Sequence, residues 1–162
     1  AFHEAGHGLL HYFLKNADPL HKITIIPHGR ALGVAFSLPE DDAYSRNRGW
    51  LLDRITIAMG GYAAEKLMLN ETTTGAQNDL EQATDLARRM VCEWGMSDVL
   101  GPIAYGQKDE PIFLGKEIAR HKDYSEDTAR AIDTEIKKIV EACLAESERI
   151  LGEQRDKLKL LA

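Results

Sequence analysis

The first residues of the chain carry the pattern that most restricts how it can fold. His3, Glu4 and His7 form an HExxH motif. On an α-helix, residues four positions apart lie on one face with their Cβ atoms about 5–6 Å apart, so the two imidazoles can reach one metal ion. Apolar residues surround the motif at helical spacing, namely Phe2, Ala5, Leu9, Leu10 and Phe13. The motif therefore predicts an amphipathic helix over residues 2–14, ended by the polar residues before Pro19.

A histidine pair with this spacing is typical of a zinc site, and Glu4 adds a base beside it. Zinc lowers the pKa of a bound water toward about 7, and a neighbouring carboxylate can take its proton while the hydroxide attacks a polarised carbonyl. The motif thus indicates peptide hydrolysis, with His3 and His7 as zinc ligands and Glu4 as the catalytic base. The competing interpretation is a surface helix with two solvated histidines, which the otherwise apolar character of this helix disfavours.

A catalytic zinc ion usually takes three protein ligands, so a third ligand must be found. The extended metzincin pattern is excluded, because Leu10 and Phe13 stand where it requires glycine and histidine. His11 would lie about 12 Å from His3 along the helix axis, too far to share an ion, so we expect it on the polar face of the helix.

Two carboxylates remain as candidate third ligands, Glu65 and Asp79. The helical pattern over residues 45–68 is interrupted by Gly60-Gly61, a pair that would let the Glu65 segment pack closely against the motif helix. A loop of small residues before Asp79 would let that side chain approach as well. Either acid could instead be an ordinary helix residue, Asp79 in a first turn favoured by the helix dipole. The residues alone leave the choice open, and the carboxylate that does not bind zinc could orient a ligand histidine.

The rest of the pattern predicts a mainly α fold with a small β-sheet near the N-terminus and a long C-terminal helix. The predicted elements are strands at residues 22–27 and 33–38 and helices at residues 45–68, 78–94 and from Ser125 onward. Residues 96–122 are mixed, with at most a short strand. We expect Gly95 to end the helix before it. One domain over residues 1–162 is the simplest organisation.

Composition excludes several classes of protein. Of the 162 residues, 44% are apolar and 28% charged, which suits one globular domain, and no apolar run approaches the roughly 18–20 residues that cross a bilayer. The 26 acidic against 20 basic residues give a net charge of −6, which argues against a nucleic-acid partner. Cys92 and Cys143 lie far apart in helical patterns, so we expect reduced core thiols.

Taken together, the motifs resemble the peptidase domain of FtsH-type proteases, which are membrane-anchored, ATP-dependent zinc metalloproteases of the AAA family. The resemblance rests on HEAGH at residues 3–7, HKITIIP at 21–27, GRALG at 29–33, Gly60-Gly61 with Ala64-Glu65, and TTGAQND at 73–79. Further blocks between Gly95 and Glu126 extend it over nearly the whole chain.

The resemblance implies a role for each candidate residue. It assigns zinc to His3, His7 and Asp79, with Glu4 as catalytic base, and leaves Glu65 to support a ligand histidine. It also implies an endopeptidase that degrades unfolded and membrane proteins as part of a homo-hexamer. Because the ligands are distant in sequence, we expect zinc binding and folding to be linked.

The chain carries no Gly-x-x-x-x-Gly-Lys-Ser/Thr phosphate loop and no membrane helix, whereas the resemblance implies both upstream of the peptidase domain. We therefore expect a soluble fragment of a longer protein, an interpretation that the abrupt Ala1-Phe2 start favours. The parent would bind ATP and magnesium through its ATPase domain. Its N-terminal anchor would lie in a bacterial inner membrane, with the peptidase on the cytoplasmic side, or in an equivalent organelle membrane.

Two other functions stay open at this stage. One is a stand-alone zinc peptidase with Glu65 as third ligand. The other is a non-catalytic, zinc-stabilised module whose last helix serves assembly through its apolar stripe. The Ile23–Ile26 strand could hold an extended substrate by β-addition or could be ordinary core sheet, and the sequence favours neither.

Overall fold

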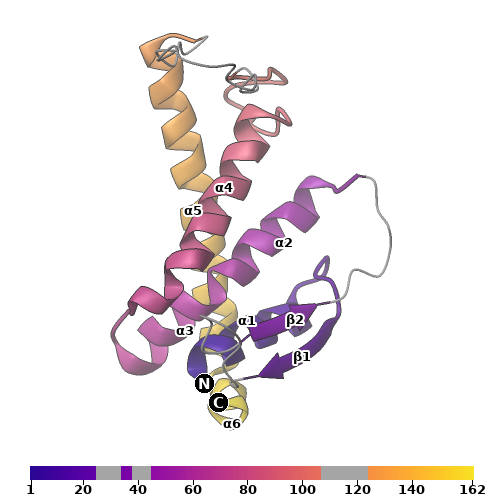
Figure 1. Ribbon diagram of the computed structural model, residues 1–162, viewed down its shortest axis with the longest axis vertical. Helices are drawn as coiled ribbons and strands as arrows, with labels where there is room; N and C mark the ends of the chain where they lie inside the picture. Colours follow the sequence, from indigo (N-terminus) through magenta and orange to yellow (C-terminus); the bar gives the residue numbers. More distant parts are fainter. Residues whose placement is uncertain (25–33, 38–44, 107–123) are drawn as a thin grey trace, which may run out of the picture.

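Helices dominate the computed structural model, which describes residues 1–24, 34–37, 45–106 and 124–162, and only the backbone of 34–37 (Figure 1). The elements are α1 (Phe2–Phe13), β1 (Leu20–Thr24), β2 (Val34–Ser37), α2 (Arg48–Ala58), α3 (Gly60–Leu69), the 3₁₀ turn η1 (Thr74–Ala76), α4 (Gln77–Cys92), α5 (Glu126–Glu153) and α6 (Arg155–Leu161). The predicted fold class, mainly α with a small sheet near the N-terminus and a long helix near the C-terminus, is confirmed.

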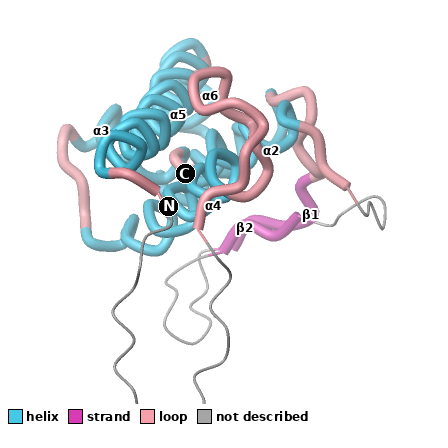
Figure 2. Tube along the Cα trace, turned by 90° about the horizontal axis from the view of Figure 1, so that it is seen from above, coloured by secondary structure: helices cyan, strands magenta, loops and turns pink. Residues whose placement is uncertain are grey.

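The small sheet consists of β1 and β2, which pair antiparallel with Thr24 opposite Val34 and Leu20 opposite Ser37. Figure 2 shows the two strands at one side of the helices. The sheet packs against α1, where a Cβ on Gly8 would overlap the Ile23 side chain. The predicted strand residues 25–27 and the turn after them lie outside the described residues.

The predicted helix over residues 45–68 is divided in two at Met59. Asn47 caps the start of α2, because its side-chain oxygen accepts a hydrogen bond from the Trp50 N–H at 2.8 Å. The α3 helix ends at Asn70, whose left-handed φ of 55° is tolerated by asparagine. The glycine pair predicted to interrupt the helix thus forms the first turn of α3.

Helix α4 ends as the sequence predicts. Gly95 has a left-handed φ of 59°, and the Met96 N–H donates to the Met90 carbonyl at 2.8 Å. This ending turns the chain away from α4.

The longest helix, α5, joins two parts of the apolar core and runs along α4 over much of the molecule (Figure 1). One part lies among α2, α4 and α5 and includes Leu51, Ile55, Met90 and Ile136. The other lies among α1, α3, α5 and α6 and includes Leu10, Ala63, Leu151 and Leu158. The predicted apolar stripe of the last helix is therefore core packing. The helix is broken at Gln154, so Leu158 lies on α6.

Both cysteines are free thiols, as the sequence predicts, with Cys143 buried and Cys92 half-buried. Burial raises the pKa of the Cys143 thiol, which keeps it protonated at neutral pH. Among the described helices, none combines the length and the apolar character that a membrane crossing requires.

The start of α5 offers a test of the helix-capping argument. The Ser125 hydroxyl accepts a hydrogen bond from the Thr128 N–H at 3.2 Å. Replacing Ser125 by alanine is expected to lower the free energy of unfolding by about 1 kcal/mol, whereas Ser125→Asp should keep most of it. Urea denaturation of the three proteins measures the difference. A Ser125→Ala protein as stable as the wild type would mean that the cap contributes nothing.

Candidate metal centre

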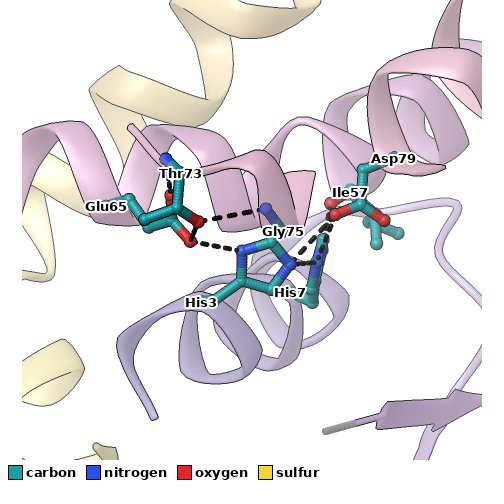
Figure 3. A network of polar contacts seen from close by, with 7 residues as sticks. All are labelled: His3, His7, Ile57, Glu65, Thr73, Gly75 and Asp79. Atoms are coloured by element: carbon teal, nitrogen blue, oxygen red, sulfur yellow. Dashed lines mark hydrogen bonds and ion pairs between the residues drawn. The ribbon is translucent and has the colours of Figure 1, made fainter. Parts of the chain in front are cut away.

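Three side chains from two segments distant in sequence converge at the N-terminal end of α1 (Figure 3). His3 and His7 lie one helical turn apart on α1, with 3.1 Å between their Nε2 atoms. Asp79, in the first turn of α4, places Oδ2 at 3.0 Å from Nε2 of His3 and 3.3 Å from Nε2 of His7. The three predicted zinc ligands are thus brought together, with one ligand atom of each within 4.8 Å of the others.

The other ring nitrogen of each histidine has its own partner. Nδ1 of His7 lies 2.7 Å from the carbonyl oxygen of Ile57, and Nδ1 of His3 lies 2.9 Å from Oε1 of Glu65. A carbonyl or carboxylate oxygen only accepts hydrogen bonds, so each Nδ1 is assigned the proton. A neutral ring then presents the lone pair of Nε2 to the cluster, which is the form that binds a metal.

This donor set fits a zinc ion. Two imidazole nitrogens and one carboxylate oxygen face each other at 3.0–3.3 Å, and three acceptors this close repel unless a cation lies between them. Two histidines and one carboxylate are also a known ligand set for catalytic zinc, which keeps a fourth position for water or substrate. Within the described part of the chain, no fourth histidine, cysteine, aspartate or glutamate joins this group.

The electrostatics of the cluster also favour a positive charge at its centre. Burial of the Asp79 carboxyl raises its pKa, but the rings of His3 and His7, when they are protonated at Nε2 as well as Nδ1, donate hydrogen bonds to the carboxylate that outweigh burial and lower the pKa to about 2. The hydrogen bond to Asp79 raises the pKa of His3, against the opposing effect of burial. The carboxylate is therefore ionised at neutral pH, as a metal ligand must be.

Glu65 approaches the site from the opposite side. Its carboxylate, on α3, is buried and contacts Nδ1 of His3, whereas Asp79 contacts Nε2 of the same ring (Figure 3). Oε2 of Glu65 accepts a hydrogen bond from the Thr73 N–H at 2.8 Å. Glu65 thus contacts the ring nitrogen of His3 that faces away from Asp79, and it lies outside the group of three converging side chains.

Small residues allow α1 and α3 to cross in contact, as the glycine pair predicts. A Cβ on Gly61 would lie 2.6 Å from Nδ1 of His3. A Cβ on Gly6 would lie 2.7 Å from Cβ of Ala64 and nearer still to the carbonyl oxygen of Gly60. The glycines therefore set the approach of the two helices that brings Glu65 to His3.

The expectation for His11 is wrong. His11 is buried, 7% exposed, and its Nδ1 lies 3.0 Å from the Asp18 carbonyl oxygen. Helix α1 contacts α2, α3, α5, α6 and both strands, so every residue from Ala5 to His11 is buried. Because other elements cover α1 here, the helix has no solvent-exposed polar face at His11.

Two contributors to the site were missed from the sequence. The carbonyl of Ile57 lies in the last turn of α2, where carbonyl groups lack partners within the helix, and its side chain carries no signal of this role. Thr73 belongs to a recognised motif, but nothing in the sequence links it to Glu65.

The predicted base, Glu4, is half-buried on α1 beside His3, and its charge helps to raise the pKa of His3.

Comparison with known proteins identifies the family to which the chain is similar. The family model described as peptidase family M41 matches residues 1–162. A protein named ATP-dependent zinc metalloprotease FtsH from Borreliella burgdorferi (strain ZS7) is 57% identical over 162 residues, which is 100% of this chain and 25% of the relative. Its namesake from Myxococcus xanthus (strain DK1622) is 52% identical over 159 residues, 98% of this chain and 25% of the relative. The chain therefore spans about a quarter of the length of these curated relatives.

Proposed function

The chain belongs to peptidase family M41, and on this basis we propose that it is the zinc-dependent endopeptidase domain of an FtsH-type, ATP-dependent protease. The observation that carries the proposal is the convergence of His3, His7 and Asp79, with both histidine rings held at Nδ1. We assign these three side chains as the zinc ligands. A bound zinc ion would polarise a peptide carbonyl and lower the pKa of a water molecule toward about 7.

In this proposal the protein residues have separate roles. Glu4 accepts a proton from the attacking water and returns it to the leaving amine. Ile57 and Glu65 fix the two rings so that each Nε2 faces the ion, because their oxygens accept the Nδ1 protons. Asp79 supplies negative charge that lowers the net charge of the site.

The geometry supports Asp79 over Glu65 as the third ligand. Asp79 lies on the Nε2 side of both rings, whereas Glu65 lies at Nδ1 of His3. Since Nδ1 and Nε2 point away from each other on the imidazole ring, one carboxylate on each side suits a ligand and a support. A stand-alone peptidase with Glu65 as ligand would need these positions reversed.

Replacing Asp79 by alanine is expected to weaken zinc binding more than a hundredfold, because loss of a residue that only supports a ligand already costs about 10–100-fold. Zinc content after dialysis against a chelator, measured by mass spectrometry, tests this. Asp85→Ala is the matched control, since Asp85 is exposed on the same helix. Full zinc content and peptide cleavage in Asp79→Ala would refute the assignment.

A non-catalytic zinc module is the weaker proposal. A structural zinc site closes its four positions with protein ligands, whereas the group described here offers three. Glu4 beside the histidines also has no role in a structural site. The apolar stripe of α5 is occupied by core packing, which leaves less of it for assembly.

We further propose that the chain works within a longer protein, since the relatives are about four times its length. That protein would unfold its substrates with an ATP- and magnesium-dependent ATPase domain, assemble as a homo-hexamer, and be held at a membrane by an N-terminal anchor. Its substrates would be unfolded polypeptides and membrane proteins. The proposed substrate-binding strand at Ile23–Ile26 is described only as far as Thr24, so that role stays a prediction.

A further inference from the structure

The loop between α3 and α4 contains three consecutive threonines that differ in their surroundings. The Thr73 hydroxyl lies 3.2 Å from Oε1 of Glu65 and 3.2 Å from the Gly75 nitrogen. Within the described residues, no hydrogen bond is formed by the hydroxyls of Thr72 or Thr74. The middle threonine therefore has a role that its two neighbours do not share.

Thr73 holds both oxygens of the Glu65 carboxylate. Its backbone N–H donates to Oε2 at 2.8 Å, and its hydroxyl donates to Oε1, the oxygen that also accepts the Nδ1 proton of His3. The terminal torsion of a glutamate side chain is broad, so one hydrogen bond does not fix the plane of the carboxylate. Two donors from one residue do fix it, and they direct Oε1 at His3.

The same hydroxyl also fixes the start of the segment that carries Asp79. Thr73 is the N-cap of η1, because its Oγ1 accepts the Gly75 N–H, and η1 leads directly into α4 (Figure 3). One hydroxyl has one proton and two lone pairs, so it can donate to Glu65 and accept from Gly75 at once. Thr73 thus links the support of His3 with the helix of Asp79.

We propose that Thr73 is a positioning residue of the zinc site, which orients the support of His3 through Glu65 and sets the start of the Asp79 helix with one hydroxyl. The inference rests on the proposed zinc ligands. It deepens that proposal by naming the residue that joins the two sides of the site. Among the described residues, no hydrogen bond joins Thr73 to His3 or Asp79, so its effect on the ion passes through Glu65 and the start of η1.

Zinc affinity of Thr73 variants tests the proposal. Thr73→Val and Thr73→Ala lose the hydroxyl and are expected to bind zinc about tenfold more weakly, while Thr73→Ser should stay within about twofold of the wild type. Thr72→Val and Thr74→Val are the matched controls and should bind zinc like the wild type. The dissociation constant is measured by competition with a chelating dye, with urea denaturation of the metal-free proteins in parallel.

A double-mutant cycle separates positioning from simple helix capping. In a Glu65→Ala background, Thr73→Val should weaken zinc binding less than it does alone, since part of its route to His3 is already lost. Equal zinc affinity of Thr73→Val and the wild type, with only the metal-free stability changed, would overturn this inference alone. Failure of the wild type to bind zinc would overturn the proposed function and this inference together.

Discussion

Replacing Glu4 by glutamine is expected to slow peptide cleavage by about 10²–10⁴-fold while zinc stays bound. Glutamine has the size of glutamate but does not accept a proton at neutral pH, so the variant removes the proposed base and little else. The converging ligand atoms belong to His3, His7 and Asp79, so their arrangement is unchanged by the substitution.

The assay should use a short unstructured peptide, because a folded substrate would also require an unfolding motor. Zinc content is measured on the same samples. Glu71→Gln is the control, since Glu71 is an exposed loop residue outside the cluster, and it should cleave like the wild type. A Glu4→Gln protein that retains zinc and cleaves at the wild-type rate would rule out the proposed mechanism.

Replacing Gly6 by alanine is expected to destabilise the protein by about 1–3 kcal/mol, although alanine favours a helix over glycine by about 1 kcal/mol. The new methyl group would overlap the backbone carbonyl of Gly60 and lie 2.7 Å from Cβ of Ala64. Backbone atoms cannot rotate away as a flexible side chain can, so α1 and α3 must separate. Zinc affinity should fall as well, because that separation moves His3 from Glu65.

Gly152→Ala provides the control of opposite sign. Gly152 is exposed on α5, and a Cβ there would meet nothing within 4 Å. This substitution should stabilise the protein by up to about 1 kcal/mol. Urea denaturation of both variants in the presence of a chelator measures the folding effect without the metal. A Gly6→Ala protein as stable as Gly152→Ala would show that the helix crossing is not tight.

Both experiments depend on the way the site is assembled. The proposed ligands come from α1 and α4, and the groups that contact them come from α2, α3 and the loop that follows α3. The four helices must dock before Nε2 of His3 and His7 meets Asp79. Zinc binding should therefore stabilise the folded chain, and removal of zinc should lower its unfolding temperature.

Local patterns were sufficient to predict most of the helices. The apolar spacing gave α1 and α5, Ser125 was recognised as a cap, and Gly95 as a helix end. These features depend on residues within one or two turns of each other, so the sequence contains the information needed. The interruption predicted at Gly60-Gly61 lies one residue after the observed break at Met59, whereas the break at Gln154 was missed, because glutamine is not a residue that stops a helix.

His11 illustrates the limit of that approach. Its place on the helix surface follows from periodicity, but whether that surface meets water depends on what packs against it. Since α1 is enclosed by helices and strands on several sides, His11 is buried and its ring is hydrogen-bonded to the Asp18 carbonyl. No local sequence pattern predicts the burial of His11, because the elements that cover it come from distant parts of the chain.

The sequence by itself determined the arrangement on which the proposed chemistry rests: HExxH on a helix fixes two imidazoles and a carboxylate within one turn, which is a matter of helical geometry alone. The residues themselves left Glu65 and Asp79 as equal candidates for the third ligand. Only the tertiary structure decided on which side of His3 each carboxylate lies. The reason is that the glycine contacts between α1 and α3 and the hydrogen bonds of Thr73 set the helix positions, and both arise only when distant segments pack together.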